Sequence, residues 1–321
     1  MTSKHPVCVD IEPDLIATAT GEAEAGAAGR VAAHVARCAP CRDEFARYRA
    51  VEVEIGALRV VPPGDRGAEA ARARLLERLA DLRSRLVTYA VFPSPLGRIL
   101  IARSEQGVSL VEYLGPRGVK DSRLMRAAGI EPEEDGASLA RLRAELLDYL
   151  AGRRARLDWP LDLRLARSDF HRAVLRATAA VPHGAVTSYA GIASEIGKPR
   201  AVRAVAQALR RNPLPIVVPC HRIIGSDGEL TGYAGDRLTL KERLLAVEGV
   251  ATRHARRHHQ IARESMYARD VADREYCLPS CGDIAQRPIG RVTLFATRAQ
   301  AEATGLAPCA SCRPDLHPLS A

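Results

Sequence analysis

The sequence predicts an α/β core, in which a small sheet with helices is followed by a helical subdomain, with a small cysteine-rich module on either side. Three observations support this expectation. The spacing of the apolar residues changes from helical to strand-like at Thr88. Two helical stretches joined by a short turn with Pro199 follow between residues 189 and 211. Closely spaced cysteines lie near both ends, and 321 residues exceed what one ordinary core holds.

Breaks in this pattern divide the chain into six expected segments. Val61-Pro62-Pro63-Gly64 ends the first module, and the change of period starts the core. The segments are an N-terminal module at 1–60, a connector helix at 61–87, a sheet-bearing subdomain at 88–165, a helical subdomain at 166–250, a basic linker at 251–272 and a C-terminal module at 273–321.

The connector is expected to be an amphipathic helix, because its apolar residues recur three and four positions apart. These residues are Ala68, Ala71, Leu75, Leu79, Leu82 and Leu86. We expect this stripe to pack on a neighbouring domain rather than to bind a dedicated partner.

The core should begin with two strands joined by a tight turn. Tyr89–Phe92 and Arg98–Ala102 have strand character, and Pro93–Gly97 has the composition of a turn. Helices are expected at 138–150, 168–180, 189–197 and 201–211. The last two have the proportions of a helix-turn-helix.

The segment at 251–272 is rich in arginine and histidine and poor in apolar residues, which predicts an exposed linker. We expect His254, His258 and His259 to be solvated there rather than to bind a metal.

Charge and hydropathy limit the partners and the compartment. The net charge is +9, which favours a polyanionic partner, although a biased arginine-rich composition would give the same number. No apolar run reaches the roughly 20 residues that cross a bilayer, and the N-terminus lacks a signal-peptide pattern. We therefore expect a monomeric cytoplasmic protein without a membrane partner.

Eight cysteines in a reducing compartment are expected to be metal ligands, reactive thiols or small buried residues. Near the C-terminus, a C-x3-C pair and a C-x2-C pair suit tetrahedral zinc. Near the N-terminus, H-x3-C-x2-C places three ligands on one side of a helix end, with a distant fourth cysteine. The candidate zinc ligands are Cys277, Cys281, Cys309 and Cys312, and then Cys8, His34, Cys38 and Cys41.

Cys220 is the one cysteine without a spacing partner. It follows the apolar run Ile216–Val218, which we expect to be a strand, and it lies in the turn Pro219-Cys220-His221-Arg222. A thiol is a weak nucleophile until a base removes its proton, since its ordinary pKa is about 8.5. His221 places an imidazole beside Cys220. A small buried residue and a nucleophile are the two open interpretations.

The region from Tyr89 to Gly249 closely resembles the O6-alkylguanine-DNA alkyltransferases. The Pro-Cys-His-Arg turn carries this resemblance together with several other motifs. They lie at 181–189, 197–205, 211–213, 232–233 and 241–249. The resemblance implies direct, single-use repair of O6-alkylguanine in double-stranded DNA.

The resemblance also assigns roles within the site. It implies that Cys220 accepts the alkyl group, that His221 is a base acting through a water, and that Glu248 orients His221. Asn212 would brace the active-site turn, and Tyr189 would contact the rotated nucleotide. No cofactor is implied for the transfer, and the thioether product permits one reaction per molecule.

DNA contact is implied for the helix-turn-helix and the loop beside the site. In this family the second helix enters the minor groove and an arginine replaces the flipped base. The residues implied are Arg203, Tyr189, Ala201, Ala204, Arg210 and Tyr233, with Ala208 also facing the groove. The loop from Tyr233 to Arg237 departs from the usual pattern, in which paired glycines or an aromatic are common, and it is one residue longer.

Both end modules have resemblances of their own. The run from Tyr276 to Asp315 is similar to the metal-binding domain of the adaptive-response protein Ada, which implies that Cys277 accepts a methyl group from DNA phosphotriesters. Leu278 stands where relatives have arginine, so purely structural zinc stays open. The N-terminal spacing is similar to anti-sigma-factor zinc modules, which implies a sigma-factor-like protein partner, with a structural zinc knot as the alternative.

Two other function classes remain to be weighed. A non-catalytic relative would recognise alkylated bases without chemistry, and a damage-responsive regulator would signal methylation of Cys220 or Cys277 through the N-terminal module. The first is disfavoured because Cys220, His221, Asn212 and Glu248 are all present.

Overall fold

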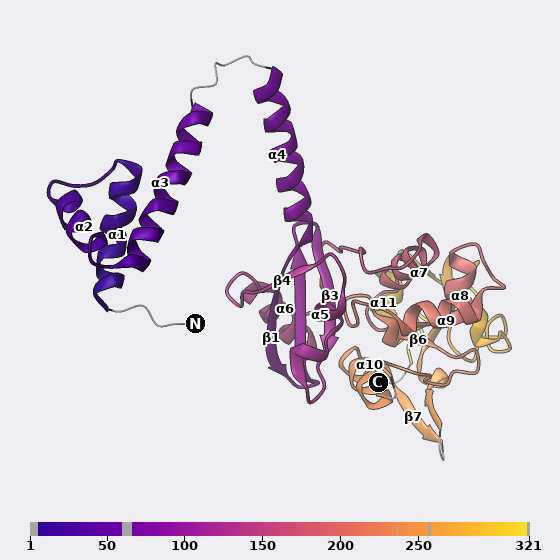
Figure 1. Ribbon diagram of the computed structural model, residues 1–321. Helices are drawn as coiled ribbons and strands as arrows, with labels where there is room; N and C mark the ends of the chain where they lie inside the picture. Colours follow the sequence, from indigo (N-terminus) through magenta and orange to yellow (C-terminus); the bar gives the residue numbers. More distant parts are fainter. Residues whose placement is uncertain (1–5, 60–65, 236, 256–257, 320–321) are drawn as a thin grey trace. The chain divides into compact units, whose positions relative to one another are not determined.

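The computed structural model describes residues 6–59, 66–235, 237–255 and 258–319, and the chain forms two compact units, 1–80 and 81–321. Figure 1 shows the elements in chain order. Within the described residues, no helix has both the length and the apolar character that crossing a membrane requires.

The first unit begins with helices α1 (Pro6–Thr20), α2 (Ala27–Val35) and α3 (Ala39–Arg59), and it includes the first part of helix α4 (Arg66–Arg85). Helices α1 to α3 surround a small core built on Leu15, Val31 and Cys41, in which cysteines replace part of the usual apolar volume. Because this core is so small, the unit needs another source of stability, as small domains commonly do.

Helix α4 (Arg66–Arg85) is the expected connector, but its apolar stripe is not buried. Leu75, Leu79 and Leu82 are 58%, 41% and 45% exposed, and Leu86 already belongs to the first strand. The expectation that this stripe packs on a neighbouring domain is therefore not met among the described residues.

The first sheet has the order β3-β2-β1-β4. Its strands are β1 (Leu86–Ser94), β2 (Gly97–Ser104), β3 (Gly107–Tyr113) and β4 (Glu131–Glu134). The predicted tight turn joins β1 to β2, where Ser94 Oγ donates to the carbonyl of Gly97 at 2.6 Å. Strand alternation sends one set of side chains toward α6 (Ala140–Leu150) and the other toward α5 (Arg123–Arg126).

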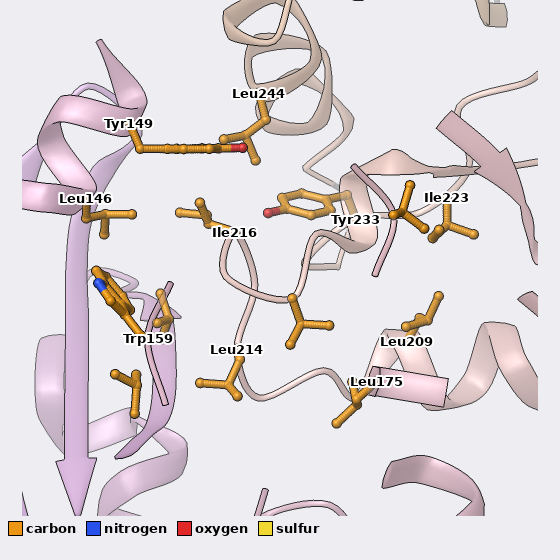
Figure 2. Close-up of a cluster of buried hydrophobic side chains, with 14 of the residues drawn as sticks. Leu146, Tyr149, Trp159, Leu175, Leu209, Leu214, Ile216, Ile223, Tyr233 and Leu244 are labelled. Carbon is orange, nitrogen blue, oxygen red and sulfur yellow. The ribbon is translucent and has the colours of Figure 1, made fainter. Parts of the chain in front are cut away.

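The helical subdomain shares one core with this sheet. It contains α7 (Asp169–Ala179), α8 (Tyr189–Glu195), α9 (Val202–Arg210) and α10 (Leu238–Val247), with the short strands β5 (Ala185–Ser188) and β6 (Ile223–Ile224). Ser168 and Ser188 cap α7 and α8 by accepting bonds from backbone N–H groups. Figure 2 shows Leu146 and Tyr149 of α6 pointing toward Ile216 and Leu244 of the helical subdomain. The predicted α/β core is confirmed.

Residues 251–272 differ from the exposed linker that the composition suggested. They form the hairpin β7 (Thr252–Ala255) and β8 (His258–Ile261), and then β9 (Tyr267–Asp270), which is largely buried. The apolar side chains of Ile261, Met266 and Ala268 enter a core, and these are too few to stand out against the surrounding charges.

The C-terminal module extends the second sheet of the core. It contains β10 (Glu275–Tyr276), β11 (Val292–Phe295), α11 (Arg298–Glu302) and β12 (Ala307–Pro308). Strand β11 pairs with β5, giving the sheet order β6-β5-β11-β9. Gly184 has a φ of 72°, which residues with a side chain rarely adopt, and a Cβ there would meet the amide end of Gln300 of α11. The module is therefore built into the core rather than tethered to it.

Candidate active site

Cys220 lies at the start of a 3₁₀ turn, Cys220–Arg222, and the residues before it form turns instead of the expected strand. Ile216 has a φ of 77°, a left-handed conformation that is strained for a β-branched residue. Asn212 holds this segment in place, since its Nδ2 donates to the carbonyl of Val218 at 2.9 Å and its Oδ1 accepts from Leu214 N at 2.9 Å.

Cys220 is half-buried, and its sulfur accepts a hydrogen bond from one side chain. Asn212 Nδ2 donates to Cys220 Sγ at 3.2 Å. Burial raises the pKa of the Cys220 thiol, while Asn212 and the charge of Lys241 act to lower it. At rest, the residue is therefore a thiol whose thiolate form already has a hydrogen-bond donor in place.

His221 and Glu248 are in contact, and the side chains of both are fully buried. His221 Nε2 lies 2.6 Å from Glu248 Oε1. Burial lowers the pKa of His221 despite the neighbouring carboxylate, so the imidazole is neutral. Its Nε2 then carries the proton donated to Glu248, and the lone pair is on Nδ1. That Nδ1 is buried without a hydrogen-bond partner among the described residues.

Glu248 is ionised although it is buried. Burial favours its neutral form, but the hydrogen bonds of His221 and Arg222 and the charge of Arg222 outweigh this effect and hold the pKa of Glu248 far below its ordinary value. Arg222 Nε donates to Oε2 at 2.9 Å, Gly184 N donates to the same oxygen at 3.0 Å, and the Tyr149 hydroxyl donates to Oε1. The orientation of this carboxylate is therefore fixed from several sides.

Sequence reasoning gave no role to two of these partners. Arg222 belongs to the Pro-Cys-His-Arg turn, but the sequence did not indicate that its side chain is buried beside a carboxylate. Tyr149 comes from α6, 99 residues before Glu248, and no spacing signal connects the two.

A pocket of about 330 Å³ opens beside the sulfur, which is within the size range of small-molecule sites. Tyr189, Cys220 and Tyr233 line it together with the loop Thr231–Gly235 and one face of α9. The hydroxyl of Tyr189 accepts a bond from Thr231 at 3.3 Å. The hydroxyl of Tyr233 is buried and lies 2.9 Å from that of Tyr113. The structure thus brings Tyr189, Tyr233 and Cys220 to one pocket.

Lys241 connects the loop to the active-site turn and was also missed as a site residue. Its Nζ is buried and donates to the carbonyl oxygens of Ile223 and Thr231. Burial lowers the pKa of Lys241 to about 8. The loop itself contains Ala234 at a φ of 43°, a conformation rare for residues with a side chain, while Asp236 lies outside the described residues.

The second helix of the helix-turn-helix, α9, is amphipathic, with one buried face and one exposed face that is free of acidic residues. Arg203, Ala204, Gln207 and Arg210 are exposed, Ala201 is half-buried, and Val202–Arg210 contains no acidic residue. Ala208 is buried, so its small side chain serves packing and not, as we expected, approach to DNA.

The C-terminal cysteines converge although they come from distant segments. The sulfur atoms of Cys277, Cys281, Cys309 and Cys312 all lie within 4.8 Å of one another. Leu278 N donates to Cys312 Sγ at 3.3 Å, a contact typical of thiolate ligands. Cys277, the candidate methyl acceptor, is only 7% exposed.

The N-terminal candidates converge in the same way. Ligand atoms of Cys8, His34, Cys38 and Cys41 lie within 4.8 Å of one another. The Nε2 atom of His34 is buried without a hydrogen-bond partner among the described residues, which is costly unless a cation takes its lone pair. Both donor sets suit tetrahedral zinc.

Three family models match consecutive parts of the chain. Residues 87–163 match the ribonuclease-like domain of 6-O-methylguanine DNA methyltransferase, residues 169–250 match its DNA-binding domain, and residues 256–315 match the metal-binding domain of Ada. The last match begins inside the β7–β8 hairpin, which agrees with the built-in position of the C-terminal module.

Individual relatives cover the core. A methylated-DNA–protein-cysteine methyltransferase of Methanosarcina barkeri is 41% identical over 160 residues, which are 50% of this chain and 96% of the relative. The constitutive enzyme of that name from Bacillus subtilis is 36% identical over 163 residues, or 51% and 96% of the two chains. The crystal structure of Mycobacterium tuberculosis OGT in complex with DNA is 34% identical, with a TM-score of 0.42, and covers 50% of this chain and 92% of that one. The chain therefore belongs to the methylated-DNA–protein-cysteine methyltransferase family.

Proposed function

We propose that this protein repairs O6-alkylguanine in DNA by transferring the alkyl group irreversibly to Cys220. The observation that carries this proposal is the buried His221–Glu248 pair, since His221 directly follows Cys220 and its Nδ1 has no hydrogen-bond partner among the described residues. A base whose tautomer is fixed by a carboxylate is what a thiol nucleophile needs.

The reaction follows from the charge states at the site. The thiol proton of Cys220 passes to His221 Nδ1 through a water, and the sulfur attacks the alkyl carbon. A sulfur–carbon bond forms as the bond between carbon and O6 breaks. The released guanine takes up one proton from water, and the imidazolium of His221 returns one proton to water. Glu248 stabilises the imidazolium that forms, and Asn212 stabilises the thiolate. The thioether cannot be broken by these residues, so each molecule acts once.

The exposed face of α9 fits the minor groove of DNA, and the pocket beside Cys220 fits a base turned out of the helix. We propose that Arg203 fills the gap left by the flipped nucleotide and that Tyr189 and Tyr233 line its path. Ala201 and Ala204 are small enough for close approach, and Arg210 would neutralise phosphates.

The direct test is repair of a duplex that contains O6-methylguanine, with wild-type protein and Cys220→Ala compared. We expect one guanine restored per wild-type molecule and none with the variant. A variant that still repairs would overturn the proposal, whereas binding by both proteins without any repair would place the chain among non-catalytic recognition proteins.

We further propose that both ligand clusters hold structural zinc. Cys277, Cys281, Cys309 and Cys312 would bind one ion, and Cys8, His34, Cys38 and Cys41 the other. When bound, the ion keeps its ligand sulfurs as thiolates. Burial of Cys277 favours structural zinc over methyl acceptance from phosphotriesters, which needs an accessible sulfur. That alternative is tested by the mass of the Cys277 peptide after exposure to DNA with methylphosphotriesters.

For the N-terminal unit, we propose a docking role toward a sigma-factor-like protein partner, which rests on the anti-sigma-like ligand spacing. We propose a monomer in a reducing, cytoplasmic compartment, where the eight cysteines form no disulfide and seven of them lie in the two ligand clusters. A pull-down with the N-terminal unit intact or carrying Cys38→Ser would show whether the zinc module holds a partner.

A further inference from the structure

Two histidines on the β7–β8 hairpin and a glutamate on α10 form a cluster that the alkyltransferase reaction does not use. His254 and His259 are directly opposite each other in the antiparallel register. Their ring centroids lie 4.5 Å apart. Glu242 Oε1 accepts from His259 Nδ1 and lies 3.7 Å from His254 Nε2. A single carboxylate oxygen therefore faces one nitrogen of each ring.

We propose that Glu242, His254 and His259 bind a divalent transition-metal ion, with zinc as the first candidate. The three ligand atoms lie within 4.8 Å of one another. Two imidazoles and one carboxylate are a donor set that zinc and its first-row neighbours accept, with the remaining positions left for water. This differs in chemistry from the sulfur-rich clusters at the two ends of the chain.

The spacing of the ligand atoms needs little adjustment. A tetrahedral zinc ion with bonds of about 2.0–2.2 Å separates its ligand atoms by roughly 3.3 Å. The distance from Glu242 Oε1 to His254 Nε2 is slightly longer than this, and the distance to His259 Nδ1 is shorter. An ion would draw the first pair together and move the second pair apart, which rotations of exposed side chains allow.

Backbone hydrogen bonds to residues 228 and 230 fix the position of the hairpin, and they therefore fix the backbone that carries His259. The carbonyl of His259 accepts from Leu230 N at 2.7 Å, and Ile261 N donates to the carbonyl of Gly228 at 3.0 Å. Ile261 itself is 2% exposed. Arg253, which directly precedes His254, is paired with Glu264 at 3.0 Å.

The exposure of the ligands indicates an exchangeable site. The side chains of Glu242, His259 and His254 are 16%, 30% and 68% exposed. Water therefore competes for the ion, and we expect weaker binding than at the cysteine clusters. A bound ion would hold the hairpin against α10, the helix that carries Lys241.

The test uses the full-length protein after its cysteine clusters have been filled with zinc and excess zinc removed. Cobalt(II) is titrated in, followed by calorimetry and by absorption. We expect one equivalent to bind without the sulfur-to-cobalt charge-transfer band that entry into a cysteine cluster would produce. His254→Gln and Glu242→Gln should each weaken this binding by more than about tenfold. His317→Gln removes an exposed histidine elsewhere and should have no effect.

Three outcomes are decisive. Binding of no further equivalent, or binding that survives both His254→Gln and Glu242→Gln, would overturn the proposal. Without added cobalt, the His254→Gln variant should repair O6-methylguanine as well as the wild type does. Failure of this metal site is therefore distinguishable from failure of the repair function. Thermal unfolding without added cobalt checks that the variants fold.

Discussion

Two glutamates, one in α10 and one directly after it, each contact a histidine, and the two pairs differ in their burial and in their hydrogen-bond partners. Glu248, directly after α10, bonds His221 with both side chains fully buried, and Arg222, Gly184 and Tyr149 occupy its other acceptor positions. Glu242, within α10, bonds His259 near the surface and faces His254 with the same oxygen. The buried pair has one fixed tautomer and one free lone pair, which suits proton transfer. The open pair has donors that can rearrange, which suits a cation.

The largest effect is expected for Glu248→Gln. The amide removes the charge that stabilises the imidazolium and leaves Arg222 buried without its partner. We expect alkyl transfer to slow by about 10²–10⁴-fold and the free energy of unfolding to fall by about 3–5 kcal/mol. Single-turnover kinetics and chemical denaturation measure the two effects. Glu242→Gln is the matched control, and an equal loss of transfer there would remove the distinction between the pairs.

Removal of one C-terminal zinc ligand should come next in size. Because β11 pairs with β5 in the core, we expect Cys309→Ser to lower the melting temperature of the alkyltransferase core by several degrees. Cys38→Ser, in the other compact unit, should leave the transition of the core unchanged. Calorimetry of both variants decides the matter, and equal effects would contradict the built-in position of the C-terminal module.

Tyr149→Phe is expected to have a moderate effect. The variant keeps the ring in the core and removes the hydroxyl that donates to Glu248 Oε1. That oxygen then becomes a stronger acceptor for His221, so the acid limb of the pH–rate profile should move to higher pH. The rate near neutral pH should fall by about tenfold or less. A profile displaced toward lower pH, or not displaced, would mean that Tyr149 does not tune the base.

The smallest effect concerns acid stability. The pKa of Glu248 is depressed in the folded state, so its contribution is present above the unfolded value of about 4.3 and is lost as pH falls toward the folded value. The wild type should therefore lose stability below about pH 4–5 more steeply than Glu248→Gln. Urea unfolding at several pH values tests the slope, and parallel curves would show that Glu248 is not the group responsible.

Much of the fold and the site could be predicted because local signals were strong. The turn between β1 and β2, the helix-turn-helix and the closely spaced ligands within each cysteine cluster follow from short-range spacing, and the structure places Cys220, His221, Asn212 and Glu248 together. What was missed depends on contacts distant in sequence. Tyr149 reaches Glu248 from another subdomain, and β9 gains its strand character from pairing with β11. Tertiary pairing overrides a weak local pattern there.

The segment before Cys220 shows a second reason why part of the structure could not be predicted from the sequence. Its apolar residues, Ile216 and Val218, gave it the appearance of a strand, but Asn212 bonds it into a turn with Ile216 in a left-handed conformation. Such strain is stored where the surrounding structure fixes it, and it cannot be inferred from hydropathy.

The most direct test of the central claim is peptide-level mass spectrometry after the protein meets a molar excess of duplex DNA containing O6-methylguanine. The account predicts one methyl group on the peptide with Cys220, no further turnover, and no methyl on the peptides with Cys277 or the N-terminal cysteines. Absence of methyl from Cys220, or continued turnover with excess substrate, would contradict it.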